Sequence, residues 1–323
     1  MSETLIEVKN LKTWFPIRKG IFQTVANHVK AVDGVSFSIK KGETLSLVGE
    51  SGCGKTTVGK TILKLIQATD GEVLYKGKDV LKMNPAELLT YRRKMQIIFQ
   101  DPAGSMNPRM LVKDIIAEGI RSFKLKPESE IEARVAELLE KVELSPDSMM
   151  RYPHEFSGGQ RQRICIARAL AVEPEFIVCD EATSALDVSV QASILNLLKN
   201  LQQELGLTYL FITHDLSVVE YLSDRVAVMY LGQIVDEATS EALFSQPKHP
   251  YTEALLKSAP SMDPDHRELI ALSGDIPSPI NPPNGCRFHG RCTKAMDRCT
   301  KQNVPFYDVE NGRSRCLLFE KEK

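Results

Sequence analysis

The sequence predicts an α/β fold with a parallel sheet, a helical section over residues 101–170 and a small loop-rich tail. Three observations carry this prediction: a glycine loop between a strand and a helix, a second strand–helix–strand unit, and a proline-rich composition past Pro247. A chain of 323 residues is long for one core, which indicates two or three folding units.

The glycine loop runs from Gly49 to Thr56 and has the spacing of a phosphate-binding loop. It follows the apolar strand 44–48 and precedes residues 57–66, whose apolar spacing is helical. Glycines allow the backbone N–H groups to approach anionic oxygens, while Lys55 can reach the phosphates and the Thr56 hydroxyl can bind Mg²⁺. The sequence therefore predicts a nucleotide site made by Gly49, Glu50, Ser51, Gly52, Cys53, Gly54, Lys55, Thr56 and Thr57.

The second unit consists of strand 176–179, helix 188–205 and strand 207–213. Its first strand ends in two carboxylates, Asp180 and Glu181. An acid at such a strand end can hold the Mg²⁺ of a nucleotide, and a second acid can polarise the attacking water. Taken alone, two acids at a strand end are also common in ordinary proteins.

A second glycine-bearing loop occupies Ser157, Gly158, Gly159 and Gln160, ahead of a helix that starts near Arg161. Its N–H groups suit a phosphate, although Ser157 is also a good helix cap. Because one nucleotide does not need two separated loops, we expect this loop to serve the nucleotide of a neighbouring subunit.

The helical section and the overall composition bound the protein class. One helix face carries an apolar stripe that we interpret as packing: Ile131, Val135, Leu138, Leu139 and Val142. A net charge of −1 gives no argument for a protein that binds nucleic acid. Apolar runs such as 225–232 are too short to cross a bilayer. The N-terminus lacks the features of a signal peptide, so we expect a cytoplasmic protein.

In order along the chain, these motifs resemble the ATP-binding subunit of an ABC transporter over roughly residues 5–260. Gly49–Thr56 matches the Walker A motif, 176–180 Walker B, and 157–160 the family signature, with Phe156 where leucine is commoner. The resemblance further implies roles for single residues: catalytic glutamate Glu181, Q-loop Gln100, D-loop Asp187, switch histidine His214, and Phe15 stacked on adenine, with its neighbour Trp14 as the alternative.

The resemblance implies a division of labour in ATP hydrolysis. Thr56, Asp180 and Gln100 would complete the Mg²⁺ shell, Glu181 would activate water, and His214 would contact the γ-phosphate region. The signature loop of a second ATP-binding subunit, a paralogue or the chain itself, would close each site.

The resemblance is closer still to the dipeptide/oligopeptide importer branch, through residues 100–109, 249–256 and 277–283. It implies two transmembrane permease subunits, an extracytoplasmic peptide-binding protein and a place on the cytoplasmic face of the membrane. Two alternatives stay open: an exporter or metal importer, and a soluble ABC ATPase of DNA repair or translation. A single cassette, the lack of heptads and near-zero charge disfavour the latter.

Four of the seven cysteines lie in the last 38 residues: Cys286, Cys292, Cys299 and Cys316. Structural zinc sites usually include two cysteines separated by two to four residues, and that pair is missing, whereas a 4Fe-4S cluster accepts wider spacing. The pattern also resembles the cysteine motif of the importer branch, which implies a 4Fe-4S cluster; zinc and free thiols remain alternatives. We expect an ABC domain over 1–260 and a cysteine module over 261–323 that the metal stabilises.

The other three cysteines, Cys53, Cys165 and Cys179, are expected to pack as small apolar side chains. Of these, Cys53 in the phosphate loop is expected to be more accessible.

Overall fold

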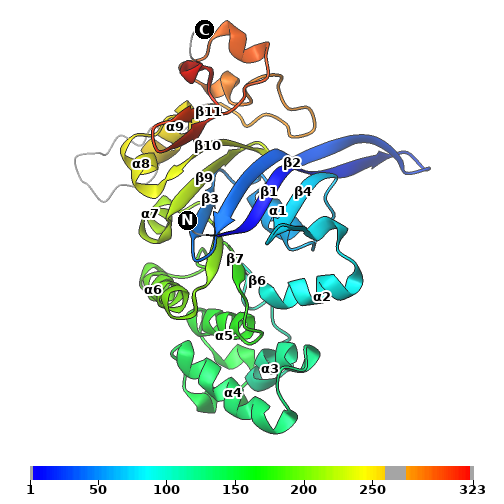
Figure 1. The fold of residues 1–323 in the computed structure, drawn as a ribbon, viewed down its shortest axis with the longest axis vertical. Helices are drawn as coiled ribbons and strands as arrows, with labels where there is room; N and C mark the ends of the chain where they lie inside the picture. The colour runs from blue at the N-terminus through cyan, green and yellow to red at the C-terminus, as the bar shows by residue number, and fades with distance from the viewer. Residues whose placement is uncertain (1–2, 259–273, 321–323) are drawn as a thin grey trace.

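The computed structural model describes residues 3–258 and 274–320, which contain two β-sheets (Figure 1). The larger sheet has the order β11-β12-β10-β9-β3-β8-β7-β6, and its neighbours from β9 to β6 run parallel. Its central strands are short and almost entirely buried, as expected for a parallel sheet with both faces covered. Their bounds are β3 Thr44–Val48, β6 Met95–Ile98, β7 Phe176–Asp180, β8 Thr208–Ile212, β9 Arg225–Tyr230 and β10 Gln233–Thr239.

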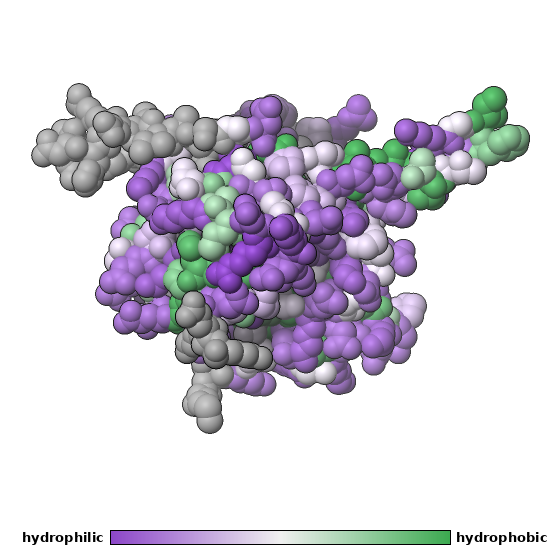
Figure 2. Space-filling view, turned by 90° about the horizontal axis from the view of Figure 1, so that it is seen from above, coloured by the Kyte–Doolittle hydropathy of each residue, from purple (hydrophilic) through white to green (hydrophobic). Residues whose placement is uncertain are grey.

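The smaller sheet is antiparallel, in the order β2-β1-β4-β5. Its strands are β1 Thr4–Lys19, β2 Thr24–Lys40, β4 Asp70–Tyr75 and β5 Lys78–Asp79. The long β1–β2 hairpin projects beyond the body of the molecule (Figures 1 and 2), and its turn leaves Ile21 96% and Phe22 90% exposed.

Helix α1 (Lys55–Ile62) follows the phosphate-binding loop and is shorter than the sequence predicts. It ends because Lys64 adopts a left-handed conformation (φ 52°), whose N–H donates to the carbonyl oxygen of Thr61. The described helices that lie outside residues 101–170 are, besides α1, α2 Pro85–Lys94, α6 Val188–Leu205, α7 Leu216–Leu222, α8 Ser240–Ser245 and α9 Pro250–Ser258.

A helical layer lies at one end of the molecule, around α3 (Val112–Ser122), α4 (Glu128–Lys141) and α5 (Gly158–Leu170) (Figure 1). The predicted apolar stripe is buried in the core that these helices share. The helical pattern that the sequence predicts over residues 101–170 is therefore confirmed. No described helix is both long and apolar enough to serve as a membrane span.

The C-terminal segment joins the large sheet through a short hairpin of β11 (Tyr307–Val309) and β12 (Gly312–Ser314). Strand β12 pairs antiparallel with β10, so this part of the tail extends the core sheet. The rest consists of 3-10 turns at His289–Arg291, Asp297–Thr300 and Leu317–Phe319. The predicted boundary near residue 261 lies outside the described residues and stays a prediction.

Candidate nucleotide-binding site

Two glycines shape the phosphate-binding loop between β3 and α1. Gly49 (φ 148°) and Gly54 (φ 110°) adopt positive φ values that other residues rarely adopt. A Cβ on Gly49 would lie 2.1 Å from the carbonyl oxygen of Met229, and a Cβ on Gly54 equally close to that of Ala31. Only glycine fits both positions, so the loop backbone lies against the end of β9 and against β2.

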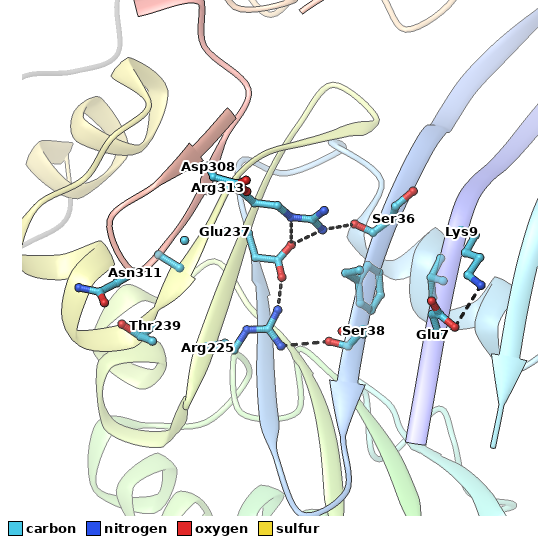
Figure 3. Close-up of a pocket in the computed structure, with 14 residues that line it drawn as sticks. Glu7, Lys9, Ser36, Ser38, Arg225, Glu237, Thr239, Asp308, Asn311 and Arg313 are labelled. Carbon is cyan, nitrogen blue, oxygen red and sulfur yellow. Dashed lines mark hydrogen bonds and ion pairs between the residues drawn. The ribbon is translucent and has the colours of Figure 1, made fainter. Parts of the chain in front are cut away.

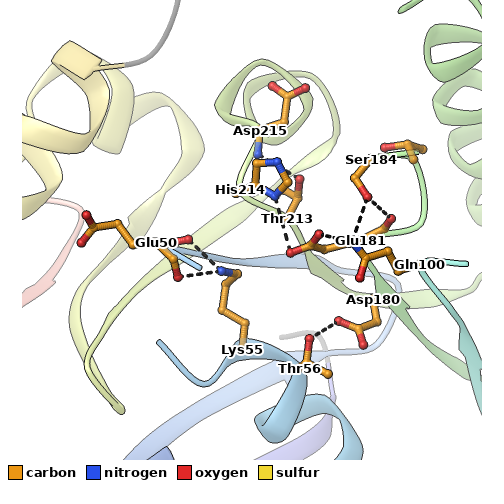
Figure 4. Close-up of polar contacts among 12 residues, drawn as sticks. Glu50, Lys55, Thr56, Gln100, Asp180, Glu181, Ser184, Thr213, His214 and Asp215 are labelled. Carbon is orange, nitrogen blue, oxygen red and sulfur yellow. Dashed lines mark hydrogen bonds and ion pairs between the residues drawn. The ribbon is translucent and has the colours of Figure 1, made fainter. Parts of the chain in front are cut away.

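Lys55 begins α1 and is only 5% exposed. Its Nζ donates to the carbonyl oxygens of Gly49 at 2.7 Å and Glu50 at 3.1 Å (Figure 4). Its ammonium thus lies inside the loop, where phosphate oxygens can replace these carbonyls as acceptors. The other predicted loop residues lie on the turn and in the first turn of α1: Ser51, Gly52 and Thr57.

Cys53 is buried, yet at 6% it is more exposed than Cys165 (1%) and Cys179 (0%), so the expected order of accessibility is confirmed. Its Sγ lies 3.8 Å from the Lys55 Nζ, and its carbonyl oxygen accepts from the Gly232 N–H at 2.9 Å. Burial raises the pKa of the Cys53 thiol. The side chain therefore packs within the loop as a small apolar group, as Cys165 and Cys179 do in the core.

The buried strand β7 delivers Asp180 to the phosphate-binding loop. The Thr56 Oγ1 donates to Asp180 Oδ1 at 2.7 Å, although 124 residues separate them in sequence (Figure 4). Burial raises the pKa of the Asp180 carboxyl against the opposing effect of the Thr56 hydroxyl. A hydroxyl and a carboxylate at hydrogen-bond distance, beside a phosphate loop, form a donor set of the kind that Mg²⁺ prefers.

Three predicted catalytic residues meet at the carboxyl ends of neighbouring strands (Figure 4). The Gln100 Nε2 donates to Glu181 Oε2 at 2.9 Å, and the His214 Nδ1 lies 3.5 Å from Glu181 Oε1. Glu181 has a left-handed backbone (φ 50°), held by its N–H donating to the Ile212 carbonyl oxygen at 2.9 Å. A left-handed non-glycine residue recurs at functional sites as well as at helix ends such as Lys64.

Ser184, the first residue of the D-loop run 184–187, completes this group, although of that run only Asp187 was assigned to the site from sequence. Its Oγ donates to the Glu181 carbonyl oxygen at 3.0 Å and lies 3.5 Å from the Gln100 Nε2. The D-loop resemblance covers residues 184–187, so sequence marks the position of Ser184, and the structure adds its contacts with Glu181 and Gln100.

The signature loop lies at the start of α5, apart from α1 in Figure 1. Ser157 accepts from the Gln160 N–H at 3.4 Å, and the Gln160 Oε1 accepts from the Ser157 N–H at 3.0 Å, which is a capping box. A Cβ on Gly159 would lie 2.3 Å from Val190, so close helix packing also uses this glycine. Ser157 and Gly158 remain exposed, which leaves their polar groups accessible to a partner.

Asp187 caps α6: its Oδ1 accepts from the Val190 N–H at 3.0 Å and from the Ser189 Oγ at 2.7 Å. These hydrogen bonds lower the pKa of the Asp187 carboxyl. Within one subunit, Asp187 therefore acts as a helix cap, and its predicted contact with nucleotide stays a prediction.

The two candidates for the adenine-stacking residue differ in their surroundings. The Trp14 Nε1 donates to Asp33 at 3.2 Å, and the Lys30 Nζ lies 5.1 Å from its ring. Phe15 is 39% exposed on the neighbouring position of β1. Its exposed ring is available to a base, which favours Phe15.

All four tail cysteines line one small cavity, together with His249 and Met296. Among residues 3–258 and 274–320, however, no group of three or more histidine, cysteine or carboxylate side chains is arranged to hold a metal ion. Burial raises the pKa of the Cys286 thiol to about 11, with the neighbouring cysteines acting in the same direction. The predicted metal is therefore not confirmed, although the predicted thiols do converge.

A separate cavity of about 450 Å³ lies between β2, β10 and β12 (Figure 3). Glu237 crosses it and accepts from both Arg225 and Arg313, which also donate to the Ser38 and Ser36 carbonyl oxygens. None of the predicted site residues lines this cavity. The charges of Arg225, Glu237 and Arg313 are paired with one another, which marks a structural joint between the two sheets.

The structure also reveals contacts of Glu50 that sequence reasoning missed. The Glu50 N–H donates to the Tyr251 Oη at 3.0 Å, and the Glu50 carboxylate accepts from both terminal nitrogens of Arg291. Arg291 belongs to none of the motifs found in the sequence. No spacing rule links positions 241 residues apart.

Two family models match the chain: ABC transporter over residues 32–184, and oligopeptide/dipeptide transporter, C-terminal region, over 235–299. The chain is 51% identical over 311 residues to the oligopeptide transport ATP-binding protein AppF of Bacillus subtilis, covering 95% of this chain and 94% of that protein. It is 50% identical to a probable peptide ABC transporter ATP-binding protein, y4tS, of Sinorhizobium fredii, covering 97% of this chain and 89% of that protein.

Among solved structures, the dimeric ATP-binding cassette MJ0796 bound to ADP and Pi matches with a TM-score of 0.64 and 30% identity, covering 73% of this chain and 99% of that one. The cassette cbiO1 of Clostridium perfringens, part of the transporter complex cbiONQ, matches with the same TM-score and 27% identity, covering 76% and 92%. With the α/β fold and the gathered motifs, these likenesses show that the chain belongs to the family of ATP-binding subunits of peptide ABC transporters.

Proposed function

We propose that the chain hydrolyses ATP to power the import of dipeptides or oligopeptides. The observation that carries this proposal is the meeting of Lys55, Thr56, Asp180, Glu181 and Gln100 at one edge of the sheet (Figure 4). The peptide substrate is supported by the family model over residues 235–299 and by the names of relatives about 50% identical to this chain.

In the proposed reaction, water attacks the γ-phosphorus of ATP, the bond to the β-phosphate oxygen breaks, and ADP and phosphate leave. Glu181 takes the proton of the attacking water, while Gln100 and His214 fix the direction of its carboxylate. Lys55 and the loop N–H groups hold the phosphates, so positioning and charge stabilisation supply most of the rate.

Thr56, Asp180 and Gln100 are the residues that would hold Mg²⁺. When bound, the ion supplies positive charge that offsets the charge of the phosphates. Because Thr56 and Asp180 already lie 2.7 Å apart, they require little rearrangement to act as ligands.

A second ATP-binding subunit completes each site in this proposal. The exposed Ser157 and Gly158, with Gly159 and Gln160, would face the phosphates held by the partner, and Asp187 would lie near the same junction. The dimeric form of the similar cassette MJ0796 supports this arrangement.

The partners follow from the family: transmembrane permease subunits that this ATPase drives from the cytoplasmic face of the membrane. We further propose an extracytoplasmic peptide-binding protein as the source of substrate. The ABC domain is assigned to residues 1–260, and the module over 261–323 stays part of the proposal.

We assign the four tail cysteines to a 4Fe-4S cluster, with a single zinc ion as the alternative. Their convergence on one cavity supports a shared group, and four thiolates are the usual ligands of such a cluster. Its role would be structural, because the segment buries few apolar side chains: Phe288, Cys299, Val304 and Leu317.

Reconstitution of the complex isolated from membranes into proteoliposomes tests the function. Uptake of labelled peptide should require ATP on the side of this subunit and should stop in Glu181→Gln. The exposed Glu137→Gln on α4 is the matched control. ATP hydrolysis coupled to a different substrate, with no peptide uptake, would contradict the peptide assignment.

A further inference from the structure

An arginine of the C-terminal segment is bound to the phosphate-binding loop. Arg291 donates to Glu50 through Nη1 at 2.8 Å and Nη2 at 3.0 Å, a two-bond contact of the geometry that favours guanidinium–carboxylate pairs. The Arg291 side chain is 4% exposed and that of Glu50 21%. The pair is therefore shielded from solvent and is screened less than a surface ion pair.

Every polar group of Glu50 takes part in a hydrogen bond. Besides the carboxylate, its N–H donates to the Tyr251 Oη and its carbonyl oxygen accepts from the Lys55 Nζ. Its side chain points away from the Lys55 ammonium (Figure 4). The residue thus joins the phosphate-binding lysine on one side to the C-terminal segment on the other.

Aromatic rings fix the position of Arg291. Its guanidinium lies 5.8 Å from the Tyr230 ring and 5.9 Å from the Phe288 ring, and its Nη1 is 3.3 Å from the Tyr230 Oη. Tyr230, Tyr251 and Phe288 pack on one another with ring centroids 4.7 to 5.3 Å apart. This aromatic cluster connects β9, α9 and the cysteine segment.

A second arginine of the same segment reinforces the connection. Arg287 donates to the Leu231 carbonyl oxygen at 2.5 Å and pairs with Asp33. Gly232, which follows Leu231 in the chain, donates its N–H to the Cys53 carbonyl oxygen inside the phosphate-binding loop. The segment between Cys286 and Cys292 therefore reaches the loop by two routes.

We propose that Arg291 is a positioning residue for ATP binding, through which the C-terminal segment sets the affinity of the phosphate-binding loop. Its charge neutralises Glu50, whose carboxylate would otherwise repel the phosphates of an incoming nucleotide. Its two hydrogen bonds also fix the Glu50 side chain, and with it the part of the loop that receives the phosphates. The inference rests on the ATP-binding function described above.

Titration with a fluorescent ATP analogue, on the full chain, tests this role. Arg291→Gln should raise the Kd by roughly five- to tenfold, because it leaves a partly buried carboxylate without its partner beside the phosphates. Turnover at saturating ATP should change by less than about twofold, since the reacting groups are untouched. Arg298→Gln, which breaks an exposed ion pair with Glu320 in the same segment, is the control and should leave the Kd unchanged.

The double variant Arg291→Gln/Glu50→Gln distinguishes an effect of the unpaired Glu50 charge on ATP affinity from an effect on folding. It removes the unpaired carboxylate, so its Kd should return to within about twofold of Glu50→Gln alone. An unchanged Kd in Arg291→Gln, a loss of equal size in Arg298→Gln, or no recovery in the double variant would each overturn the proposal. Failure of both Arg291 variants to fold would assign the pair to folding and overturn it as well. If the unaltered chain itself does not bind the ATP analogue, the ATP-binding function is overturned instead.

Discussion

The nucleotide site and the C-terminal segment over residues 286–320 are stabilised in different ways. The nucleotide site lies at the ends of β3, β7 and β8, whose residues are nearly all buried and joined by ladder hydrogen bonds. The C-terminal segment has short turns and buries four apolar side chains, of which Phe288 packs into the body and Cys299, Val304 and Leu317 form a small cluster of their own. Its connections to the body include the β10–β12 pairing, the packing of Phe288 on Tyr230 and Tyr251, and the ion pairs of Arg287, Arg291 and Arg313.

This difference shows that the two regions respond to different perturbations. A site built on a parallel sheet keeps its geometry when a distant ion pair is lost, because apolar burial holds its strands. A segment with a small core depends more on individual charged contacts. Variants in each region should therefore separate effects on ATP binding from effects on stability.

The largest expected effect on ATP binding comes from Lys55→Ala. The change removes the ammonium inside the loop, so the Kd for ATP should rise by about a hundredfold or more. Isothermal titration with ATP measures it, and Lys126→Ala, which breaks an exposed ion pair with Glu130 at the start of α4, is the control. An affinity like that of the unaltered chain would show that the loop does not bind phosphate.

Phe15→Ala should weaken ATP binding by about tenfold, because the base loses its stacking partner. Trp14→Phe should have little effect on ATP affinity. The reverse order of these two variants in the same titration would assign adenine stacking to Trp14.

Tyr251→Phe should raise the Kd for ATP by only two- to threefold, roughly the effect of one lost hydrogen bond to the Glu50 N–H. Tyr221→Phe provides a comparison, because its hydroxyl contacts Asn196 on the exposed surface far from the loop in sequence. A change of tenfold or more would mean that α9 controls the loop more strongly than Arg291 does.

Cys299→Ser should change ATP affinity by less than about threefold, yet it should release the bound metal and lower the thermal stability of the C-terminal segment. Anaerobically purified unaltered protein should carry about four iron and four sulfide per chain and absorb near about 400 nm. Cys165→Ser is the control, because Cys165 lies in the core and contacts Ser105. Colourless protein with one zinc per chain would favour the alternative ion.

Much of the nucleotide site could be predicted from sequence because its parts are local. The spacing of Gly49, Lys55 and Thr56, and the acids directly after an apolar strand, each occupy one short stretch. Parallel strands then bring their carboxyl ends to the same edge without further information. The capping role of Ser157 is likewise local, and the sequence predicts it as the alternative to a phosphate-binding role.

The long-range contacts of the tail left no such signal. The pairing of β12 with β10 and the contact of Arg291 with Glu50 depend on how a loop-rich segment folds back. The direction of the Cys53 side chain also left no signal: its neighbours Ser51 and Gly52 are exposed, but its own side chain faces Lys55 inside the loop. Sequence position alone does not distinguish the two sides of a turn.

The central claim is that Glu181 activates the attacking water at a site formed on this sheet. The most direct test measures phosphate release and ATP binding together in Glu181→Gln, which keeps the side-chain shape but removes the base. ATP should still bind, turnover should fall by about a hundredfold or more, and ATP should drive dimerisation seen by sedimentation. Hydrolysis at the unaltered rate in Glu181→Gln would contradict the account.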